Sequence, residues 1–287
     1  YQATTSRMET NDYWVHDLSP FLIEFPTTIF GIEGIRYYGV AYLLGFFAVW
    51  YFLKICEQKG KLSLNAKDRS DLMTYLILGV LIGGRLGYVL FYDFQDFIRN
   101  PFLFFRIDQG GMASHGGFIG VSLALLIFCQ NRNLNSLKLV DCISVVAPLG
   151  LALGRIANFI NGELWGKIST VPWAVLFPNS PMTFSSLTNY YGIQPRHPSQ
   201  LYAAISEGFI PLIYLQFRFW YTKASLGQLT GEFLILYSLL RIFNEVYREP
   251  DASLIAGISR GQFYSIILLI FGISFWLYAK KKIPQIN

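Results

Sequence analysis

The stretch LVDCISVVAPLGLALGRIANFINGELWGK, residues 139–167, joins a segment of membrane-spanning length to a polar end. Residues 139–160 are close to the roughly 20 apolar residues that a spanning helix needs. Polar and ionised groups lie toward the end of the stretch, among them Arg155, Asn158, Asn161 and Glu163. An Arg at membrane depth costs roughly 2.5–3.5 kcal/mol on insertion scales. We therefore expect these groups to act on a substrate, on an ion or on one another.

The rest of the chain predicts further spanning helices. Of its 287 residues, 53% are hydrophobic and 14% are charged, whereas soluble domains carry about 25% charged residues. The mean hydropathy is +0.39. Apolar stretches near spanning length lie at 37–56, 71–92, 113–130, 139–160, 201–222, 227–247 and 261–279. We therefore expect an all-α polytopic membrane protein with seven transmembrane helices, the third short and preceded by a broken or re-entrant lead-in, GGMASHGG.

The positive charges predict the orientation in the membrane. Lysines and arginines cluster around the first connection and at the end of the chain, at Lys54, Lys59, Lys61, Lys67, Arg69, Lys280, Lys281 and Lys282. Because such residues are enriched on the cytoplasmic side, we expect the N-terminus outside and the C-terminus in the cytoplasm. The formal net charge is +5, but no soluble domain concentrates it on one face, so we expect no binding of nucleic acid.

The longest connection predicts a small external head. It spans about 161–200, between the fourth and fifth apolar stretches, and connections of that length are more often functional than idle. We expect an external N-terminal segment over 1–36 and a membrane domain over 37–287. Residues 21–39, FLIEFPTTIFGIEGIRYYG, contain short β-like apolar runs with glycine turns.

Two further polar residues lie among glycines in apolar stretches. Arg85, in LIGGRLGYVLFY, has glycine neighbours that leave room for another helix or a lipid headgroup. It could equally reach the membrane interface or pair with an acid such as Glu163 or Asp141. His115, in GGMASHGGFIG, is either a hydrogen-bonded core histidine or a base or headgroup donor. No second His or acid stands at ligand spacing, so His115 predicts no metal site.

Residues that share a helix face suggest a phosphate site. Arg155 and Asn158 are three residues apart. With Asn161 and Glu163 they offer a guanidinium, two carboxamides and an acid, groups that suit a phosphate diester and glycerol hydroxyls.

A second helix presents a similar set. Tyr237, Arg241 and Glu245 recur at four-residue steps, and Arg248 extends their face. Arg241 and Glu245 could simply neutralise each other, or Arg241 could join Arg155 in a clamp on one phosphate. Tyr38 and Tyr42 are also one turn apart, and an interfacial aromatic belt explains them as well as a role in binding does.

Other functions are less well supported. Cys56, Cys129 and Cys142 lie in or at the ends of apolar segments without CxxC spacing, as small buried hydrophobes do. A transporter for an anionic solute would also keep arginines in the membrane, but the chain has no internal repeat. An intramembrane aspartic peptidase would need two facing acids, and a purely structural lipid-binding protein remains an alternative.

The motifs resemble one enzyme family. GRIANFINGELWGK, residues 154–167, is similar to the signature of the bacterial phosphatidylglycerol–prolipoprotein diacylglyceryl transferases. GGRLGYVLFY, GGMASHGGFIG, RHPSQLY and the Tyr-x3-Arg-x3-Glu face before REPD follow in the family's order, so that the resemblance covers roughly 37 to 260. Two positions depart from the family pattern: Ala157 replaces a Gly, and Ala203 stands where the family tends to have Glu.

The resemblance implies a seven-span enzyme of the bacterial inner membrane. It would transfer the diacylglyceryl group of phosphatidylglycerol to the thiol of a lipobox cysteine in a preprolipoprotein, and it would use no metal or cofactor. Its signal-peptide substrate and membrane lipids would be its partners. By resemblance, Arg155 and Arg241 are essential, and the contributing residues are Tyr38, His115, Asn158, Glu163, Gly166, Tyr237 and Glu245. We expect the two arginines to hold the phosphate and His115 to accept the thiol proton, with phosphate or water as the alternative acceptor.

Overall fold

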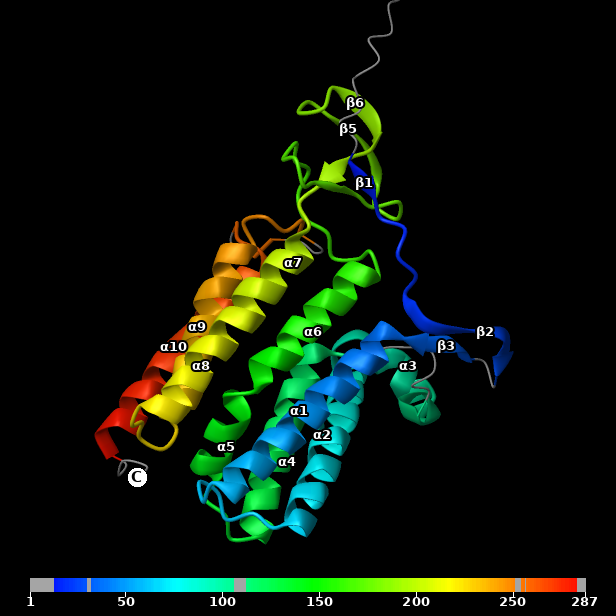
Figure 1. The fold of residues 1–287 in the computed structure, drawn as a ribbon. Helices are drawn as coiled ribbons and strands as arrows, with labels where there is room; N and C mark the ends of the chain where they lie inside the picture. Colours follow the sequence, from blue (N-terminus) through cyan, green and yellow to red (C-terminus); the bar gives the residue numbers. More distant parts are fainter. Residues whose placement is uncertain (1–12, 30–31, 106–111, 251–253, 256, 283–287) are drawn as a thin grey trace, which may run out of the picture. The chain divides into compact units, whose positions relative to one another are not determined.

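The computed structural model describes residues 13–29, 32–105, 112–250, 254–255 and 257–282 (Figure 1). Most of these residues are helical. The chain divides into two compact units, a first unit made of Tyr1–Gly45 and Ser144–Asn287 and a second unit made of Phe46–Ile143.

Every apolar stretch of spanning length is helical. The first four correspond to α1 (Tyr37–Gln58), α2 (Ala66–Tyr92), α4 (Ser114–Asn131), and α5 (Ser136–Ser144) followed by α6 (Ala147–Ile160). The last three correspond to α7 (Ser199–Ala203), η3 (Ala204–Phe209) and α8 (Ile210–Tyr221) in series, then α9 (Gln228–Asn244) and α10 (Arg260–Lys282). Pro148, in the first turn of α6, accompanies the break between α5 and α6.

Several of these helices are suited to a membrane. Among the described residues, four helical stretches are long and apolar enough to cross one: Tyr37–Gln58, Ala66–Leu90, Ser136–Ile160 and Arg260–Lys281. Helix Gly116–Asn131 is apolar but shorter, and the fifth and sixth stretches carry ionised side chains, including Glu207 and Arg241. Such a set of helices is typical of a multi-pass membrane protein.

In the second unit, α2 and α4 pack through glycines. A Cβ on Gly79 would lie 2.7 Å from the carbonyl oxygen of Gly120, and one on Gly87 would lie 2.8 Å from Gly116 Cα. Only residues without side chains allow two helix backbones to approach so closely. The glycines around Arg85 therefore accommodate a neighbouring helix, which was one of the two roles expected for them. The short helix α3 (Phe94–Arg99) and the 3-10 turn η1 (Pro101–Phe105) follow α2.

In the first unit, α6 contacts η3, and α9 packs along α10. Gly231 of α9 meets Trp276 of α10, where an added Cβ would lie 2.8 Å from the Trp276 Cβ. Leu215 and Leu229 are fully buried in this unit.

One ion pair joins α8 to α9, with side chains 17% and 11% exposed, and we call it the Arg218–Glu232 clasp. Arg218 Nε and Nη2 donate to the two carboxylate oxygens of Glu232 over 2.8 and 2.6 Å. The Tyr214 hydroxyl, the Gln228 amide and the Trp276 indole also donate to Glu232, over 3.2, 3.1 and 3.5 Å.

The expectation of an all-α protein is only partly right, because strands form outside the long helices. The β-like runs before the first span are confirmed as the antiparallel pair β2 (Phe21–Ile29) and β3 (Ile32–Arg36). The 161–200 connection contains β4 (Val175–Leu176), β5 (Met182–Ser185), β6 (Tyr190–Ile193) and β7 (Pro195–Arg196).

The strands of this connection form two small sheets. β4 lies between β7 and the N-terminal strand β1 (Trp14–Val15), and β5 pairs with β6. Strand pairing satisfies the backbone hydrogen-bonding groups of this connection, which contains no long helix. A side chain also stabilises the β5–β6 hairpin. The Gln194 amide donates to the carbonyls of Thr183 and Tyr190 over 2.8 Å each.

Candidate functional site

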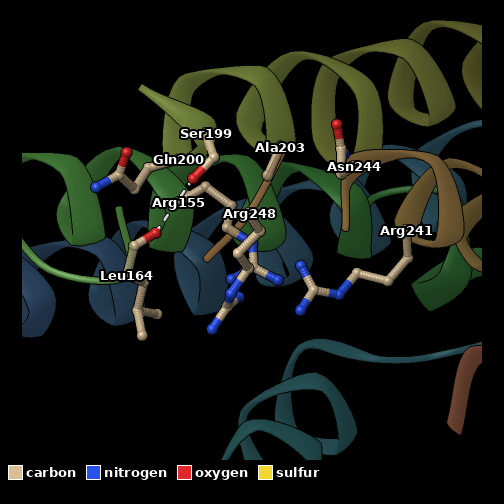
Figure 2. A pocket seen from close by; sticks show the side chains of 8 residues that line it. All are labelled: Arg155, Leu164, Ser199, Gln200, Ala203, Arg241, Asn244 and Arg248. Atoms are coloured by element: carbon tan, nitrogen blue, oxygen red, sulfur yellow. Dashed lines mark hydrogen bonds between the residues drawn. The ribbon is translucent and has the colours of Figure 1, made fainter. Parts of the chain in front are cut away.

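A pocket in the first unit brings together three arginines, one from α6 and two from the end of α9 and the residues after it. The lining consists of Arg155, Leu164, Ser199, Gln200, Ala203, Arg241, Asn244 and Arg248 (Figure 2). The three guanidinium groups point toward one another, and none of the described residues in the lining is acidic. The pocket is therefore suited to an anion.

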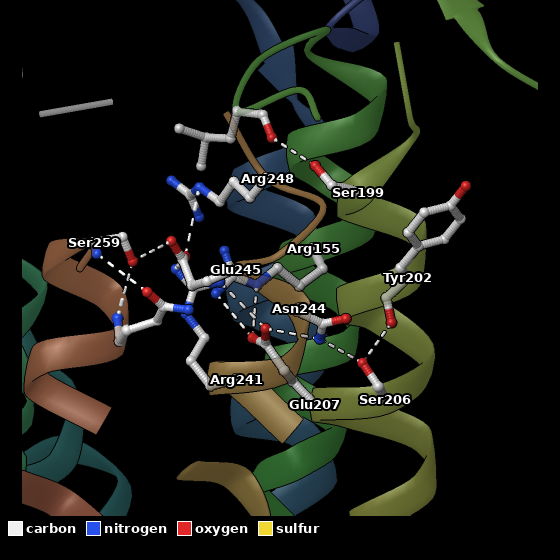
Figure 3. Close-up of polar contacts among 12 residues, drawn as sticks. Arg155, Ser199, Tyr202, Ser206, Glu207, Arg241, Asn244, Glu245, Arg248 and Ser259 are labelled. Atoms are coloured by element: carbon white, nitrogen blue, oxygen red, sulfur yellow. Dashed lines mark hydrogen bonds and ion pairs between the residues drawn. The ribbon is translucent and has the colours of Figure 1, made fainter. Parts of the chain in front are cut away.

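The arginines predicted to form a clamp meet at one carboxylate, Glu207, as Figure 3 shows. Arg155 lies on α6, and its Nε and Nη2 donate to Glu207 Oε2 over 3.2 and 3.0 Å. Arg241 lies on α9, and its Nη1 donates to Glu207 Oε1 over 3.2 Å. Tyr237 lies one helical turn before Arg241 on α9. The structure thus brings the two arginines together.

An irregular helical turn carries Glu207. The π-helix η3 (Ala204–Phe209) lies between α7 and α8, and π-turns occur frequently at functional sites. Gly208 lets this turn approach α6, since a Cβ there would lie 2.5 Å from the Cβ of Ala152. The Asn244 amide donates to Glu207 Oε1 over 3.1 Å. The Glu207 side chain is 0% exposed.

A second carboxylate, Glu245, holds the far side of Arg241. Arg241 Nη2 lies 2.5 Å from Glu245 Oε1, and Arg248 Nε lies 3.9 Å from the same oxygen. The Ser259 hydroxyl donates to Glu245 Oε2 over 2.7 Å, and a Cβ on Gly261 would lie 2.6 Å from Oε1. The predicted common face of Arg241 and Glu245 is confirmed. The two do form an ion pair, but Arg241 also binds Glu207 and lines the pocket.

Together these residues form what we call the charge network: Arg155, Glu207, Arg241, Glu245 and Arg248. Positive and negative groups alternate along it. Three guanidinium groups and two carboxylates give the network a formal net charge of +1. The guanidinium groups line the pocket, while the carboxylates do not.

A second polar cluster joins the start of α1 to the end of α6. The Tyr38 hydroxyl hydrogen-bonds with Glu163 Oε1 and with the Asn158 amide. The Asn158 amide also donates to Glu163 Oε1 over 2.9 Å, and the Gln200 amide donates to the Glu163 carbonyl over 2.6 Å. The structure therefore brings together Tyr38, Asn158 and Glu163. Tyr42, one turn further along α1, is 60% exposed, as an interfacial tyrosine would be.

The end of α6 explains why Asn158 and Glu163 meet. Gly162 has φ +64° and ends the helix in the left-handed region that glycine adopts most readily. The chain then turns back, and the Glu163 N–H donates to the Asn158 carbonyl over 3.2 Å. Asn161 is the last residue of this turn and does not line the pocket.

Gly166 lies where three segments cross. A Cβ on Gly166 would lie 2.5 Å from the His197 carbonyl oxygen and 2.7 Å from that of Tyr247. The Gly166 N–H donates to the His197 carbonyl over 3.0 Å. Gly166 therefore allows these three segments of backbone to meet beside the pocket.

Burial lowers the pKa of His197 below its usual value, which favours the neutral ring near neutral pH.

Two predicted residues belong to the second unit. Arg85 is 5% exposed, its Nε donates to the Phe104 carbonyl over 2.9 Å, and its guanidinium lies 5.5 Å from the centre of the Tyr88 ring. His115 lies in the first turn of α4. The three cysteines are buried, as expected.

Sequence reasoning missed Glu207, Asn244 and Ser259. A signal for Glu207 was present, because it is the only acidic residue between positions 201 and 222 and therefore an ionisable group within a spanning stretch. Asn244 and Ser259 are ordinary polar residues near helix ends, and no sequence pattern distinguishes them.

Known proteins resemble this chain along nearly its whole length. The sequence profile of the prolipoprotein diacylglyceryl transferases matches residues 27–278. A protein of Idiomarina loihiensis named phosphatidylglycerol–prolipoprotein diacylglyceryl transferase is 39% identical over 283 residues, which cover 96% of this chain and 99% of the relative. Proteins of the same name from Pseudoalteromonas translucida and Legionella pneumophila (strain Lens) are 42% and 40% identical. These alignments cover 92% and 86% of this chain and 97% and 93% of the relatives.

Proposed function

Because this chain belongs to the prolipoprotein diacylglyceryl transferase family, we propose that it transfers a diacylglyceryl group from phosphatidylglycerol to a preprolipoprotein. The acceptor is the thiol of the cysteine in the lipobox of the signal peptide. The observation that carries this proposal beyond family membership is the pocket, where three guanidinium groups face one another without an acidic residue in its described lining. Such a site fits the phosphate of an anionic lipid.

The reaction requires the phosphate to leave with an electron pair. The cysteine sulfur forms a bond to the glycerol carbon, and the bond between that carbon and the phosphate oxygen breaks. The phosphate begins as a singly charged diester and leaves as glycerol phosphate with one more negative charge. Arg155 and Arg241, supported by Arg248, bind it and stabilise the charge that develops. Preorganised donors of this kind commonly make the largest single contribution to catalysis.

The thiol must also lose its proton. A free cysteine has a pKa near 8.5, so modest assistance is sufficient at neutral pH. His115 is our candidate for the acceptor, and the departing phosphate or a water molecule is the alternative.

The remaining predicted residues bind the lipid headgroup. Tyr38, Asn158 and Glu163 form one hydrogen-bonded cluster that includes the end of α6, and hydroxyl groups of a headgroup glycerol can exchange into such a cluster. Asn161 and Arg85 remain predictions as binding residues, as do Tyr237, Glu245 and Gly166. We propose no metal or cofactor.

We further propose how the chain lies in the bacterial inner membrane. It crosses the membrane seven times, with residues 1–36 and the head at about 161–200 outside and the C-terminus in the cytoplasm; residues 37–287 form the membrane domain. The lysine-rich first connection and chain end support this orientation. Cysteines introduced at exposed positions test it, because the native cysteines are buried. A membrane-impermeant thiol reagent applied to intact cells should label Tyr191→Cys in the head and not Lys67→Cys, and the reverse pattern would contradict the orientation.

The transfer itself is tested with purified protein, phosphatidylglycerol and a lipobox peptide. We expect a peptide whose mass has increased by one diacylglyceryl group, together with free glycerol phosphate. The same peptide with serine in place of the cysteine should gain no mass, and vesicles of phosphatidylcholine should support no transfer. Absence of the modified peptide, with inserted and folded protein, would refute the proposed function.

A further inference from the structure

One fully buried carboxylate, Glu207, lies between two of the three arginines of the pocket, Arg155 and Arg241. Each oxygen of Glu207 accepts hydrogen bonds from a different arginine, Oε2 from Arg155 and Oε1 from Arg241. Two guanidinium groups drawn together in a site shielded from water repel each other. A carboxylate between them offsets this repulsion before any ligand arrives.

We propose that Glu207 is a positioning residue that also sets the charge preference of the site. It holds Arg155 and Arg241 together in the empty pocket, and it limits the positive charge so that the singly charged phosphodiester binds well and the doubly charged product leaves. This inference rests on the proposed transfer reaction.

The placement of Glu207 indicates that it acts through the arginines. Its side chain is completely buried and is absent from the lining of the pocket. Asn244 provides a further donor to Oε1, and the contact of Gly208 with Ala152 fixes the π-turn against α6. Both oxygens are therefore occupied by neighbours, and the carboxylate has no direct path to a substrate.

The charge of the network changes by one when Glu207 is neutralised. Three guanidinium groups and two carboxylates carry a net charge of +1, which becomes +2 with glutamine at position 207. A phosphodiester carries one negative charge, whereas a phosphate monoester with a second pKa near 6 carries about two at pH 8. Removing the charge of Glu207 should therefore favour the monoester over the diester.

The test compares two soluble ligands that differ in charge, glycerophosphoglycerol and glycerol phosphate. Each is titrated at pH 8 into the full chain in detergent by calorimetry, and lipidation is measured in parallel. The variants are Glu207→Gln, which keeps the length of the side chain, and Glu207→Asp, which keeps the charge. Glu232→Gln is the matched control, since it removes the charge of another arginine-bound carboxylate in the same unit.

We expect Glu207→Gln to shift the ratio of the two dissociation constants at least tenfold toward glycerol phosphate and to lower kcat/KM for lipidation at least 30-fold. Glu207→Asp should keep the ratio of the wild-type chain while kcat/KM falls about tenfold, because the shorter side chain cannot reach both arginines. Glu232→Gln should change neither the ratio nor kcat/KM of the folded protein by more than twofold.

A ratio that stays unchanged in Glu207→Gln would overturn the inference even if activity falls, because a purely structural loss weakens both ligands alike. Wild-type kcat/KM in that variant would overturn it as well. If Glu207→Gln cannot be purified, a shifted ratio in Glu207→Asp has the same consequence. Failure of the wild-type chain to modify the peptide would instead refute the transfer reaction, and the titrations still decide the effect of Glu207 on anion preference.

Discussion

The charge network and the Arg218–Glu232 clasp are built from the same parts but differ in their balance of charge. Both lie in the first unit, both use α9, and both place a carboxylate against arginine. In the clasp, one arginine meets one carboxylate through two parallel hydrogen bonds of 2.8 and 2.6 Å, and three neutral donors complete the carboxylate. In the network, three arginines share two carboxylates and face a pocket.

This difference distinguishes a structural ion pair from a binding site. An ion pair whose charges balance and whose donors and acceptors are satisfied does not attract a further ion. Its role is to join helices. The network has one guanidinium group more than it has carboxylates, and its arginines line a pocket, which suits it to bind an anion. Matched changes in the two clusters should therefore affect activity to different degrees.

The largest difference should follow from removal of one arginine in each cluster. We expect Arg155→Ala or Arg241→Ala to lower kcat/KM for lipidation by at least about 10³-fold, because each removes a charged donor to the departing phosphate. Arg218→Ala should leave the activity of the folded protein within threefold of wild type. The measurement is peptide lipidation in detergent, normalised to folded protein by size-exclusion chromatography. Equal losses in all three variants would show that the bundle, not the pocket, depends on arginine.

Glycine contacts beside the two clusters provide a second comparison. Gly208→Ala places a Cβ 2.5 Å from that of Ala152, which should push η3 away from α6 and separate Glu207 from Arg155. We expect a loss of activity of about 30-fold. Gly231→Ala creates a similar clash with Trp276 between α9 and α10, 2.8 Å from its Cβ. It should lower thermal stability to a similar degree while the folded fraction keeps its activity.

Thermal unfolding followed by tryptophan fluorescence, together with lipidation assays, separates these two outcomes. If Gly208→Ala retains full activity, the close approach of η3 to α6 has no part in positioning Glu207.

The sequence predicted the helices better than it predicted their irregularities. Each apolar stretch that the sequence predicts as a span is helical in the described chain. Apolar length is a reliable signal because a helix that crosses a membrane needs a long apolar run. The β-like runs at residues 21–39 were also predicted. The π-turn of η3 and the strands of the 161–200 connection were not, because they depend on contacts such as Gly208 with Ala152 and β4 with β1. Such contacts join residues far apart in sequence, and the hydrophobic periodicity of a segment does not predict them.

The candidate site shows the same division. Arg155 and Arg241 were paired from the sequence as a hypothesis, because two arginines near one membrane boundary suggest a common anion. Glu207 is an isolated acid in a spanning stretch, but the sequence does not show its partners, because 52 and 34 residues separate it from Arg155 and Arg241. Gly166 entered only through resemblance, and the crossing of segments that requires glycine there is visible only in three dimensions.

A smaller effect should follow from loosening Glu245. Its Oε2 accepts the Ser259 hydroxyl over 2.7 Å, and the same carboxylate holds Arg241. Hydrogen bonds to charged groups contribute about 1.5–3 kcal/mol, of which only the part that reaches Arg241 affects catalysis. We expect Ser259→Ala to lower kcat/KM about fivefold and Ser259→Thr, which keeps the hydroxyl, to restore most of it. A threonine variant as impaired as the alanine variant would mean that side-chain volume, not the hydroxyl, is what matters.

The smallest and most closely matched comparison concerns two amides. Asn244 donates to Glu207 and Gln228 donates to Glu232, each over 3.1 Å. Replacing either by alanine removes one donor to a carboxylate, and each change should cost about 1.5–3 kcal/mol of stability. Only Asn244→Ala loosens a carboxylate that positions the arginines of the pocket, so we expect it to lower kcat/KM about threefold while Gln228→Ala leaves it unchanged. Parallel denaturation and lipidation measurements decide the matter: equal stability losses with unequal activities support the division between network and clasp, and equal activities would remove it.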